Sequence, residues 1–256
     1  MKNKMPKDNF STQAHLYAKF RPKYPKELYD FVLNLIENRQ IAWDCATGNG
    51  QVASELANHF EQVFATDISQ KQLDNAPQNA KISYTISSAE HTHFPDNIFD
   101  LVTVGQALHW FDFQPFYQEV RRVCKPNAIL AVWGYGTLII DYQAINDKMQ
   151  YFYQEQIGKY WDAERHHIDE EYRSIPFDFL EINSPTFSMN YEWTIDELQG
   201  YLNTWSSVQK YIKIHNQNPV NLFISEIKSL KQNDSTLKIC FPLFLKIGRI
   251  NQTNHF

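Results

Sequence analysis

The fold is decided by the stretch Asp44-Cys45-Ala46-Thr47-Gly48-Asn49-Gly50, which stands between an apolar run and a helical pattern. A lone acid, Asp67, closes the next apolar run. Glycine adopts positive φ and lets a ligand approach the backbone, so the stretch predicts a tight turn from strand to helix. A carboxylate at the end of the second strand can accept both hydroxyls of a ribose. Together, the glycine turn and Asp67 predict an open α/β sheet with a nucleoside site at the ends of its first two strands.

Alternating strand and helix patterns surround this stretch over residues 25–133. Short connections between such elements indicate a doubly wound, mostly parallel sheet. The alternating part contains five predicted strands, and two more are predicted later, at 186–193 and 237–247. We therefore expect an α/β fold with a seven-stranded sheet. The predicted strands cover 41–46, 62–67, 82–87, 99–104, 128–133, 186–193 and 237–247, and the predicted helices of the alternating part start at Pro25 and cover 50–60 and 112–123.

The regular alternation ends after the fifth strand. Residues 137–185 are polar, aromatic and predicted to be helical, which indicates an insertion that covers the substrate. Thr194 with Glu197 forms a capping box before one helix, and Pro219 starts another. Pro242 inside the last strand predicts an edge or a bulge. We expect four segments: an N-terminal lid and first helix (1–40), a cofactor-binding core (41–136), the helical insertion (137–185), and C-terminal helices with the last strands of the same sheet (186–256).

Composition limits the function. The chain has 256 residues, a net charge of −5 and a sequence pI near 6.0. We therefore expect no nucleic-acid partner, because a basic face for phosphates is not indicated. Its three cysteines are widely spaced, which favours a reducing cytoplasm. No apolar run reaches the length of a membrane span, so no membrane association is expected.

Two cofactors compete for the glycine turn. Residues 48–53 fit the dinucleotide pattern G-x-G-x-x-A. In a dinucleotide site, however, Asp44 would lie near a pyrophosphate of like charge. S-adenosylmethionine brings an ammonium and a sulfonium, which suit Asp44. The chain also has no second glycine fingerprint, so S-adenosylmethionine is favoured over NAD.

These residues resemble the motifs of class I S-adenosylmethionine-dependent methyltransferases of the small-molecule type. Residues 44–50 resemble the family's first motif, Asp67 its second-strand acid, Ser88-Ala89-Glu90 with Phe94-Pro95 its third motif, and residues 99–103 its fourth strand. Ala46 departs from the pattern, since it replaces the first glycine. The resemblance implies a Rossmann-like methyltransferase fold, S-adenosylhomocysteine as product, and these cofactor contacts: Asp44, Ala46, Gly48, Gly50, Asp67, Ile68, Ser88, Ala89, Glu90, Gln106 and Ala107.

A narrower resemblance, to the trans-aconitate methyltransferase-like branch, rests on residues 17–25, 106–111 and the helix after Trp193-Thr194. It implies that the segment with Tyr17 and Arg21 folds over the cofactor. Arg21 can then hold a carboxylate through its planar fork.

The acceptor should lie beyond the carboxyl end of the fourth strand. His109 is the candidate catalytic base or a pocket wall, and Trp110 either faces the methyl group or packs a helix. Arg165 and Tyr172 are candidates for binding an acidic substrate, although a solvated helix face explains the same charges and is somewhat favoured for each residue singly. His166-His167 and His91-x-His93 lack further ligands in the sequence, so no metal is expected. The amino-methylating pattern D/N-P-P-Y/F is absent after the fourth strand.

Three functions remain at this point. The first is methyl transfer to a small molecule, with a carboxylic acid as the acceptor; a carboxylate needs no base, whereas a hydroxyl or amine would need His109. The second is an NAD-linked oxidoreductase, and the third is a protein that binds S-adenosylmethionine without turnover. The expected partner is a small-molecule acceptor, and the expected state is a monomer or a homodimer.

Overall fold

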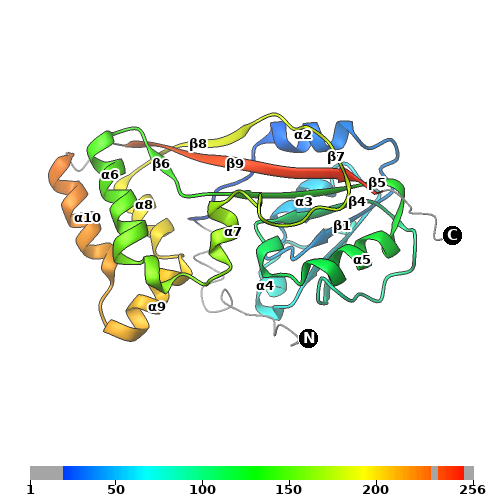
Figure 1. Ribbon diagram of the computed structural model, residues 1–256, viewed down its shortest axis with the longest axis horizontal. Helices are drawn as coiled ribbons and strands as arrows, with labels where there is room; N and C mark the ends of the chain where they lie inside the picture. The colour runs from blue at the N-terminus through cyan, green and yellow to red at the C-terminus, as the bar shows by residue number, and fades with distance from the viewer. Residues whose placement is uncertain (1–19, 232–235, 251–256) are drawn as a thin grey trace.

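The computed structural model describes residues 20–231 and 236–250 (Figure 1). The strands are β1 (Ile41–Cys45), β2 (Gln62–Asp67), β3 (Ile82–Ile86), β4 (Phe99–Gly105), β5 (Cys124–Tyr135), β6 (Ile139–Ile140), β7 (Leu180–Glu181), β8 (Phe187–Trp193) and β9 (Leu237–Arg249). The α-helices are α2 (Lys26–Asn34), α3 (Gln51–Leu56), α4 (Gln70–Asp74), α5 (Phe113–Val123), α6 (Gln143–Tyr151), α7 (Arg165–Asp169), α8 (Ile195–Leu202), α9 (Ser206–His215) and α10 (Pro219–Leu230). Shorter turns are the 3-10 helices η2 (Leu108–Trp110) and η4 (Gly158–Tyr160) and the π-helix η3 (Phe152–Gln156).

Five parallel strands in the order β3-β2-β1-β4-β5 form one half of the sheet, as predicted. Successive residues of a strand face opposite sides, so Ala42 packs in the core beneath α2 and α3, while Trp43 packs in the core beneath α5. Both faces are covered, which explains why these strands are apolar almost throughout. The winding reverses between β1 and β4, and a ligand site is expected there.

The long strand β9 organises the other half of the sheet. It runs antiparallel to β5 through Leu243–Arg249 and antiparallel to β8 through Leu237–Leu243. β8 therefore runs in the same direction as β5, and the sheet is mostly parallel. Within the described residues the sheet has nine strands, because the two-residue strands β6 and β7 join the seven that were predicted. Two residues are too few to give a periodic signal in the sequence.

Pro242 was predicted to mark an edge or a bulge. The edge alternative is wrong, because β9 has neighbours on both sides. Its carbonyl accepts a hydrogen bond from the Gly136 nitrogen at 3.4 Å, and its partner in β8 is Ser188. The missing N–H thus points to the gap between the end of β5 and β6, where no ladder bond is required.

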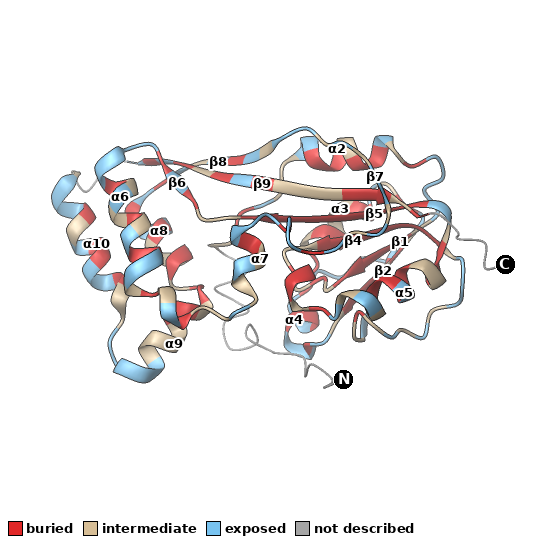
Figure 2. Ribbon diagram, viewed as in Figure 1, coloured by how far each residue is buried: buried red, intermediate tan, exposed pale blue. Residues whose placement is uncertain are grey.

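Helices from both sides of the expected boundary at residue 185 pack together at one end of the molecule. Figure 1 shows α6 beside α8, α9 and α10, and Figure 2 shows buried residues on the sides where these helices meet. The segment 137–185 also contains β6 and β7, so it is not helical throughout. The predicted capping box of α8 is present, with the Thr194 hydroxyl accepting from the Glu197 nitrogen. Helix α9 was not predicted. In residues 20–231 and 236–250 no helix combines the length and apolar character needed to cross a bilayer.

Candidate active site

A pocket lies at the carboxyl ends of β1, β2 and β4. The helical part of the chain that contains residues 161–165 and 201–206 forms its other side. Its cofactor side is lined by Ala46, Gly48, Asp67, Ile68, Ser69, Gln72, Ser87, Ala89, Glu90, Gly105, Gln106 and Ala107. Its acceptor side is lined by Arg21, His109, Trp110, Phe111, Asp112, Trp161, Asp162, Arg165, Tyr201, Trp205 and Ser206. The position is the one that the order of the strands predicts.

The turn after β1 uses three left-handed residues: Ala46 at φ 54°, Gly48 at φ 56° and Gly50 at φ 78°. A side chain at Gly48 would meet nothing within 4 Å and would project into open space, whereas one at Gly50 would lie 2.6 Å from the Tyr84 hydroxyl. Gly48 thus leaves room beside the backbone, and Gly50 makes room for packing. Ala46 takes the left-handed conformation without being glycine, at a cost of about 1–2 kcal/mol.

Asp44 lies behind this turn and is almost completely buried. Its Oδ2 accepts hydrogen bonds from the Thr47 hydroxyl (2.5 Å) and the Ala53 nitrogen (3.1 Å), and its Oδ1 accepts one from the Thr103 hydroxyl (2.8 Å). Burial raises the pKa of the Asp44 carboxyl to about 6, despite these hydrogen bonds, and the charge of Asp67 acts in the same direction. Asp44 is not among the residues that line the pocket. Its carboxylate ties the turn and the start of α3 to β4.

Asp67 lines the pocket at the end of β2. Its Oδ2 accepts a hydrogen bond from the Gly48 nitrogen at 2.9 Å, and its Oδ1 accepts one from the Ser69 nitrogen at 2.9 Å. The two backbone donors orient the carboxylate, and each oxygen retains acceptor capacity. Ile68, 42% exposed, offers an apolar surface next to it.

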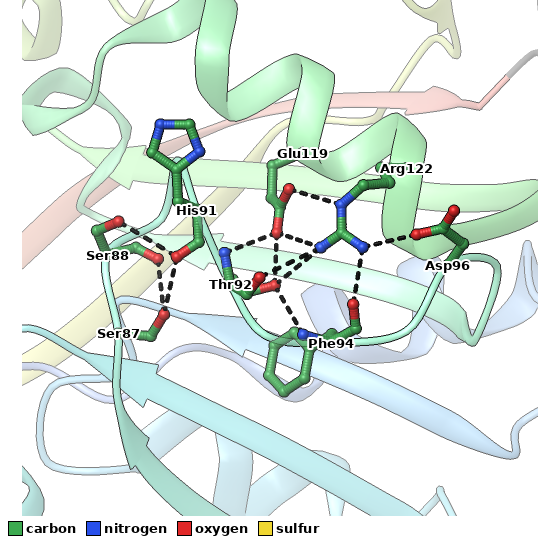
Figure 3. Close-up of polar contacts among 8 residues, drawn as sticks. All are labelled: Ser87, Ser88, His91, Thr92, Phe94, Asp96, Glu119 and Arg122. Carbon is green, nitrogen blue, oxygen red and sulfur yellow. Dashed lines mark hydrogen bonds and ion pairs between the residues drawn. The ribbon is translucent and has the colours of Figure 1, made fainter.

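The loop after β3 carries Ala89 and Glu90 to the pocket and is fixed from behind (Figure 3). Glu119 of α5 accepts hydrogen bonds from the Thr92 nitrogen (2.7 Å) and the Arg122 guanidinium (2.7 Å). Burial favours a neutral Glu119, but the hydrogen bonds from Arg122 and Thr92 outweigh burial and lower the pKa of its carboxyl. This network lets a loop without regular structure present a defined wall.

Gln106 lies just after β4 with a left-handed φ of 57°. Its side-chain amide pairs with the backbone of Tyr135: Nε2 donates to the carbonyl (3.0 Å), and Oε1 accepts from the nitrogen (2.7 Å). The Tyr135 hydroxyl in turn accepts a hydrogen bond from Arg21 Nη1 at 3.0 Å. Gln106 therefore joins the end of β4 to the segment that bears Arg21.

His109 is buried in η2 and lines the pocket, with its Nδ1 2.9 Å from the Tyr172 hydroxyl. Tyr172 was predicted to contact the substrate, and the structure corrects this. Its side chain is fully buried behind His109, packs on Phe244 at 4.9 Å between ring centroids, and does not line the pocket. The left-handed residues Glu171 and Tyr172 turn the chain inward there, which the sequence did not reveal.

Two arginines line the acceptor side, and a run of aromatic rings connects them. We call Tyr201, Trp205 and Trp161 the aromatic wall; neighbouring centroids lie 5.7 and 5.4 Å apart. Arg21 lies over Tyr201 at 5.5 Å, and Arg165 lies over Trp161 at 4.8 Å. The Arg165 Nε also donates to the Tyr153 hydroxyl at 2.8 Å. The wall could not be read from the sequence, because its rings come from two helical segments that meet only in three dimensions.

Twelve of the predicted site residues line this one pocket: Ala46, Gly48, Asp67, Ile68, Ala89, Glu90, Gln106, Ala107, His109, Trp110, Arg21 and Arg165. Asp44, Gly50, Ser88 and Tyr172 do not line it, and Ser87 stands where Ser88 was expected. Tyr17 lies outside the described residues. Ser69 and Gln72 line the pocket and were missed.

Comparison with known proteins identifies the family. Residues 43–132 match the family model described as a methyltransferase domain. A protein of Dictyostelium discoideum named as a methyltransferase is 33% identical over 252 residues, which are 94% of this chain and 95% of the relative. The chain belongs to the class I S-adenosylmethionine-dependent methyltransferases. A solved structure from Anaeromyxobacter dehalogenans, described as a type II methyltransferase, is 31% identical, has a TM-score of 0.83 and covers 91% of this methyltransferase and 99% of its own chain.

The same fold recurs in more distant proteins. A methyltransferase structure from Bacillus halodurans, at 17% identity and a TM-score of 0.52, shares the fold alone. The comparisons provide no support for an NAD-linked oxidoreductase or for a protein without turnover, and they do not single out the trans-aconitate branch.

The pocket fits the family's cofactor, S-adenosylmethionine. Gly48 leaves open space where a side chain would stand, and the carboxylate of Asp67 is oriented at the pocket wall. Gln72 is almost completely buried in the same lining, and its Oε1 has no hydrogen-bond partner among the described residues. A polar ligand would satisfy this acceptor.

Proposed function

We propose that this methyltransferase transfers the methyl group of S-adenosylmethionine to the carboxylate of a small molecule. One observation carries the proposal: Arg21 and Arg165 line the pocket that also contains Asp67, and they lie at the two ends of the aromatic wall. Guanidinium groups bind carboxylates in a fixed planar geometry. The wall offers rings for the apolar body of such an acid.

The arginines of the pocket lie only on its acceptor side. Asp67 and Glu90 lie on the cofactor side, whereas the acceptor side combines Arg21 and Arg165 with Asp112 and Asp162. Asp162 is paired with Lys210 at 2.6 Å. S-adenosylmethionine supplies an electrophilic methyl group on a cationic sulfonium when bound. We propose that Asp67 accepts the ribose hydroxyls, that Ile68 lies against the adenine, and that Asp44 acts indirectly by supporting the turn.

Orientation and exclusion of water are the main tasks of the acceptor side. Well-placed reactants can supply about 7–11 kcal/mol of a barrier through orientation alone. The Nε1 of Trp161 is buried and has no hydrogen-bond partner among the described residues, so it is available to an oxygen of the acceptor. A carboxylate is already a nucleophile, and His109 then acts as a pocket wall fixed by Tyr172 rather than as a base.

We also propose that the protein belongs to the trans-aconitate branch and is a monomer or a homodimer. We propose further that it has no nucleic-acid partner and is located in the cytoplasm. These proposals rest on the resemblance, the charge and the cysteine content described above. The four-segment division of the chain is likewise proposed, with the segment 137–185 as part of the acceptor cover.

Two measurements test the proposal. Calorimetry with S-adenosylhomocysteine should show binding, and a methyl-transfer assay should then find turnover with small polycarboxylates. Arg165→Gln should raise the KM for the acid at least about 10-fold, as expected from a lost charge-assisted hydrogen bond, while leaving S-adenosylhomocysteine affinity unchanged. Arg173→Gln is the matched control, because Arg173 is exposed and pairs with Glu171 outside the pocket. Turnover of an alcohol or amine, with every acid inactive, would refute the carboxylate.

A further inference from the structure

Three potential metal ligands come together on the helix that carries Arg165. His166, His167 and Glu170 each place one ligand atom within 4.8 Å of the others. His166 and Glu170 are four residues apart, one helical turn, and the Glu170 nitrogen donates to the His166 carbonyl at 2.9 Å. The sequence showed only the two neighbouring histidines, and the turn that ends α7 supplies the third group.

The histidine rings are oriented by oxygens on their Nδ1 side. His166 Nδ1 lies 2.5 Å from the Ala163 carbonyl oxygen, and His167 Nδ1 lies 3.0 Å from the Ser174 hydroxyl. A carbonyl oxygen only accepts, so His166 Nδ1 carries the hydrogen and its Nε2 carries the lone pair. Metal-binding histidines are characteristically oriented in this way, with the second ring nitrogen bonded to a carbonyl or similar group.

The spacing and the ligand types select the kind of ion. In a tetrahedral zinc site with bonds near 2.1 Å, ligand atoms lie about 3.4 Å apart, so the three groups, which lie within 4.8 Å of one another, need to approach by at most about 1.4 Å. Glu170 and His166 are exposed and His167 is half-buried, so their side chains can make that adjustment. Two imidazoles and one carboxylate favour Zn²⁺ and similar transition metals over Ca²⁺ or Mg²⁺, which prefer oxygen.

Most of the acids near the cluster are already paired. Of the five acids within residues 162–171, Asp162 pairs with Lys210, Asp169 with Arg165 and Glu171 with Arg173. An ion would therefore be held by the three side chains themselves rather than by an excess of nearby negative charge.

We propose that His166, His167 and Glu170 form a binding site for one divalent transition-metal ion of the Zn²⁺ type. None of the three lines the methyl-transfer pocket, so the ion would stabilise α7 rather than take part in the reaction. Arg165 precedes His166 directly and does line the pocket, and His167 packs against Phe113 at the start of α5 at 5.6 Å. The ion would thus fix the helix that carries an acceptor-side arginine.

Calorimetric titration of the untagged full chain with Zn²⁺, without cofactor or acceptor, tests the site. We expect one ion per chain with a Kd below about 50 µM at pH 7.5. The double variant His166→Gln with His167→Gln should abolish binding, and Glu170→Gln should weaken it at least about 10-fold. The control is His91→Gln with His93→Gln, a histidine pair on another exposed loop, which should bind as the wild type does.

Weaker binding by the wild type, or unchanged binding by the His166/His167 double variant or by Glu170→Gln, would overturn the proposal. S-adenosylhomocysteine titration of the same variants distinguishes this result from a failure of the proposed function. It reports the cofactor side, which contains none of the three residues.

Discussion

Replacing Asp44 by asparagine should make the protein more stable at neutral pH, although Asp44 begins the motif that identifies the family. The carboxyl is buried with three hydrogen-bond donors, and burial raises its pKa to about 6. An unfolded aspartate titrates near 3.9. A pKa raised in the folded state means that folding binds a proton. The stabilising contribution is complete below about pH 4 and is lost as the pH rises through 6.

The magnitude follows from the shift of roughly two pKa units, which corresponds to about 3 kcal/mol over the whole range and to about 2 kcal/mol between pH 4.5 and 7.5. Asparagine does not titrate, keeps one acceptor for the Thr47 and Ala53 donors, and can donate to the Thr103 oxygen. The free energy of unfolding of Asp44→Asn minus that of the wild type should therefore grow by about 2 kcal/mol across this window.

Urea unfolding at a series of pH values, followed by far-UV circular dichroism, measures this difference, and titrations common to both proteins cancel. Thr103→Val provides a second check, because it removes a donor that favours the charged form and should raise the Asp44 pKa further. A difference between Asp44→Asn and wild type that stays flat from pH 4.5 to 7.5 would refute the reasoning, since it would mean that Asp44 folds without taking up a proton.

Three further predictions concern single contacts. Asp67→Asn should weaken S-adenosylhomocysteine binding by about 10- to 100-fold in calorimetry, because a charged acceptor is worth about 1.5–3 kcal/mol; equal affinity would argue against the ribose contact. Tyr172→Phe should lower the free energy of unfolding in urea by about 1–3 kcal/mol, because His109 loses a buried hydrogen bond; no change would show that the bond contributes nothing. Gly134→Ala should cost about 1–3 kcal/mol in the same assay, since its Cβ would lie 2.5 Å from a phenylalanine ring, whereas Gly136→Ala, with nothing within 4 Å, should stay within about 0.5 kcal/mol.

The parallel half of the sheet and the cofactor side were predictable because their signals are local. An apolar run, a glycine turn and an acid at the next strand end each occupy a few consecutive residues, and the topology brings them to one edge. The position of Asp44 was harder to predict. An acid at the first position of the motif can line the pocket, or it can support the turn from behind, and the sequence looks the same in both cases. Only the donors at Thr47, Thr103 and Ala53 distinguish the two.

The acceptor side was predicted in part, because it depends on packing between distant segments. Arg165 was found from its charge within the insertion, but Tyr201 and Trp205 belong to a segment that gave no sign of facing a ligand. Tyr172 was selected for the same reason as Arg165, namely its residue type and its place in the insertion. It is nevertheless buried, because two left-handed residues turn the chain toward the core there. Short strands such as β6 are set by their partner β9 and carry no pattern of their own.

The place of β9 has a consequence for how the chain folds. This strand comes last among the described strands, yet it pairs with both β5 and β8, joining Arg249 to Ile129. Contacts so distant in sequence slow folding, because a long loop must close before they form. Until β9 arrives, the apolar strand β5 presents an unpaired edge on which another chain can add a strand. We therefore expect slow refolding, and fragments that end before residue 237 should aggregate rather than form a smaller methyltransferase core.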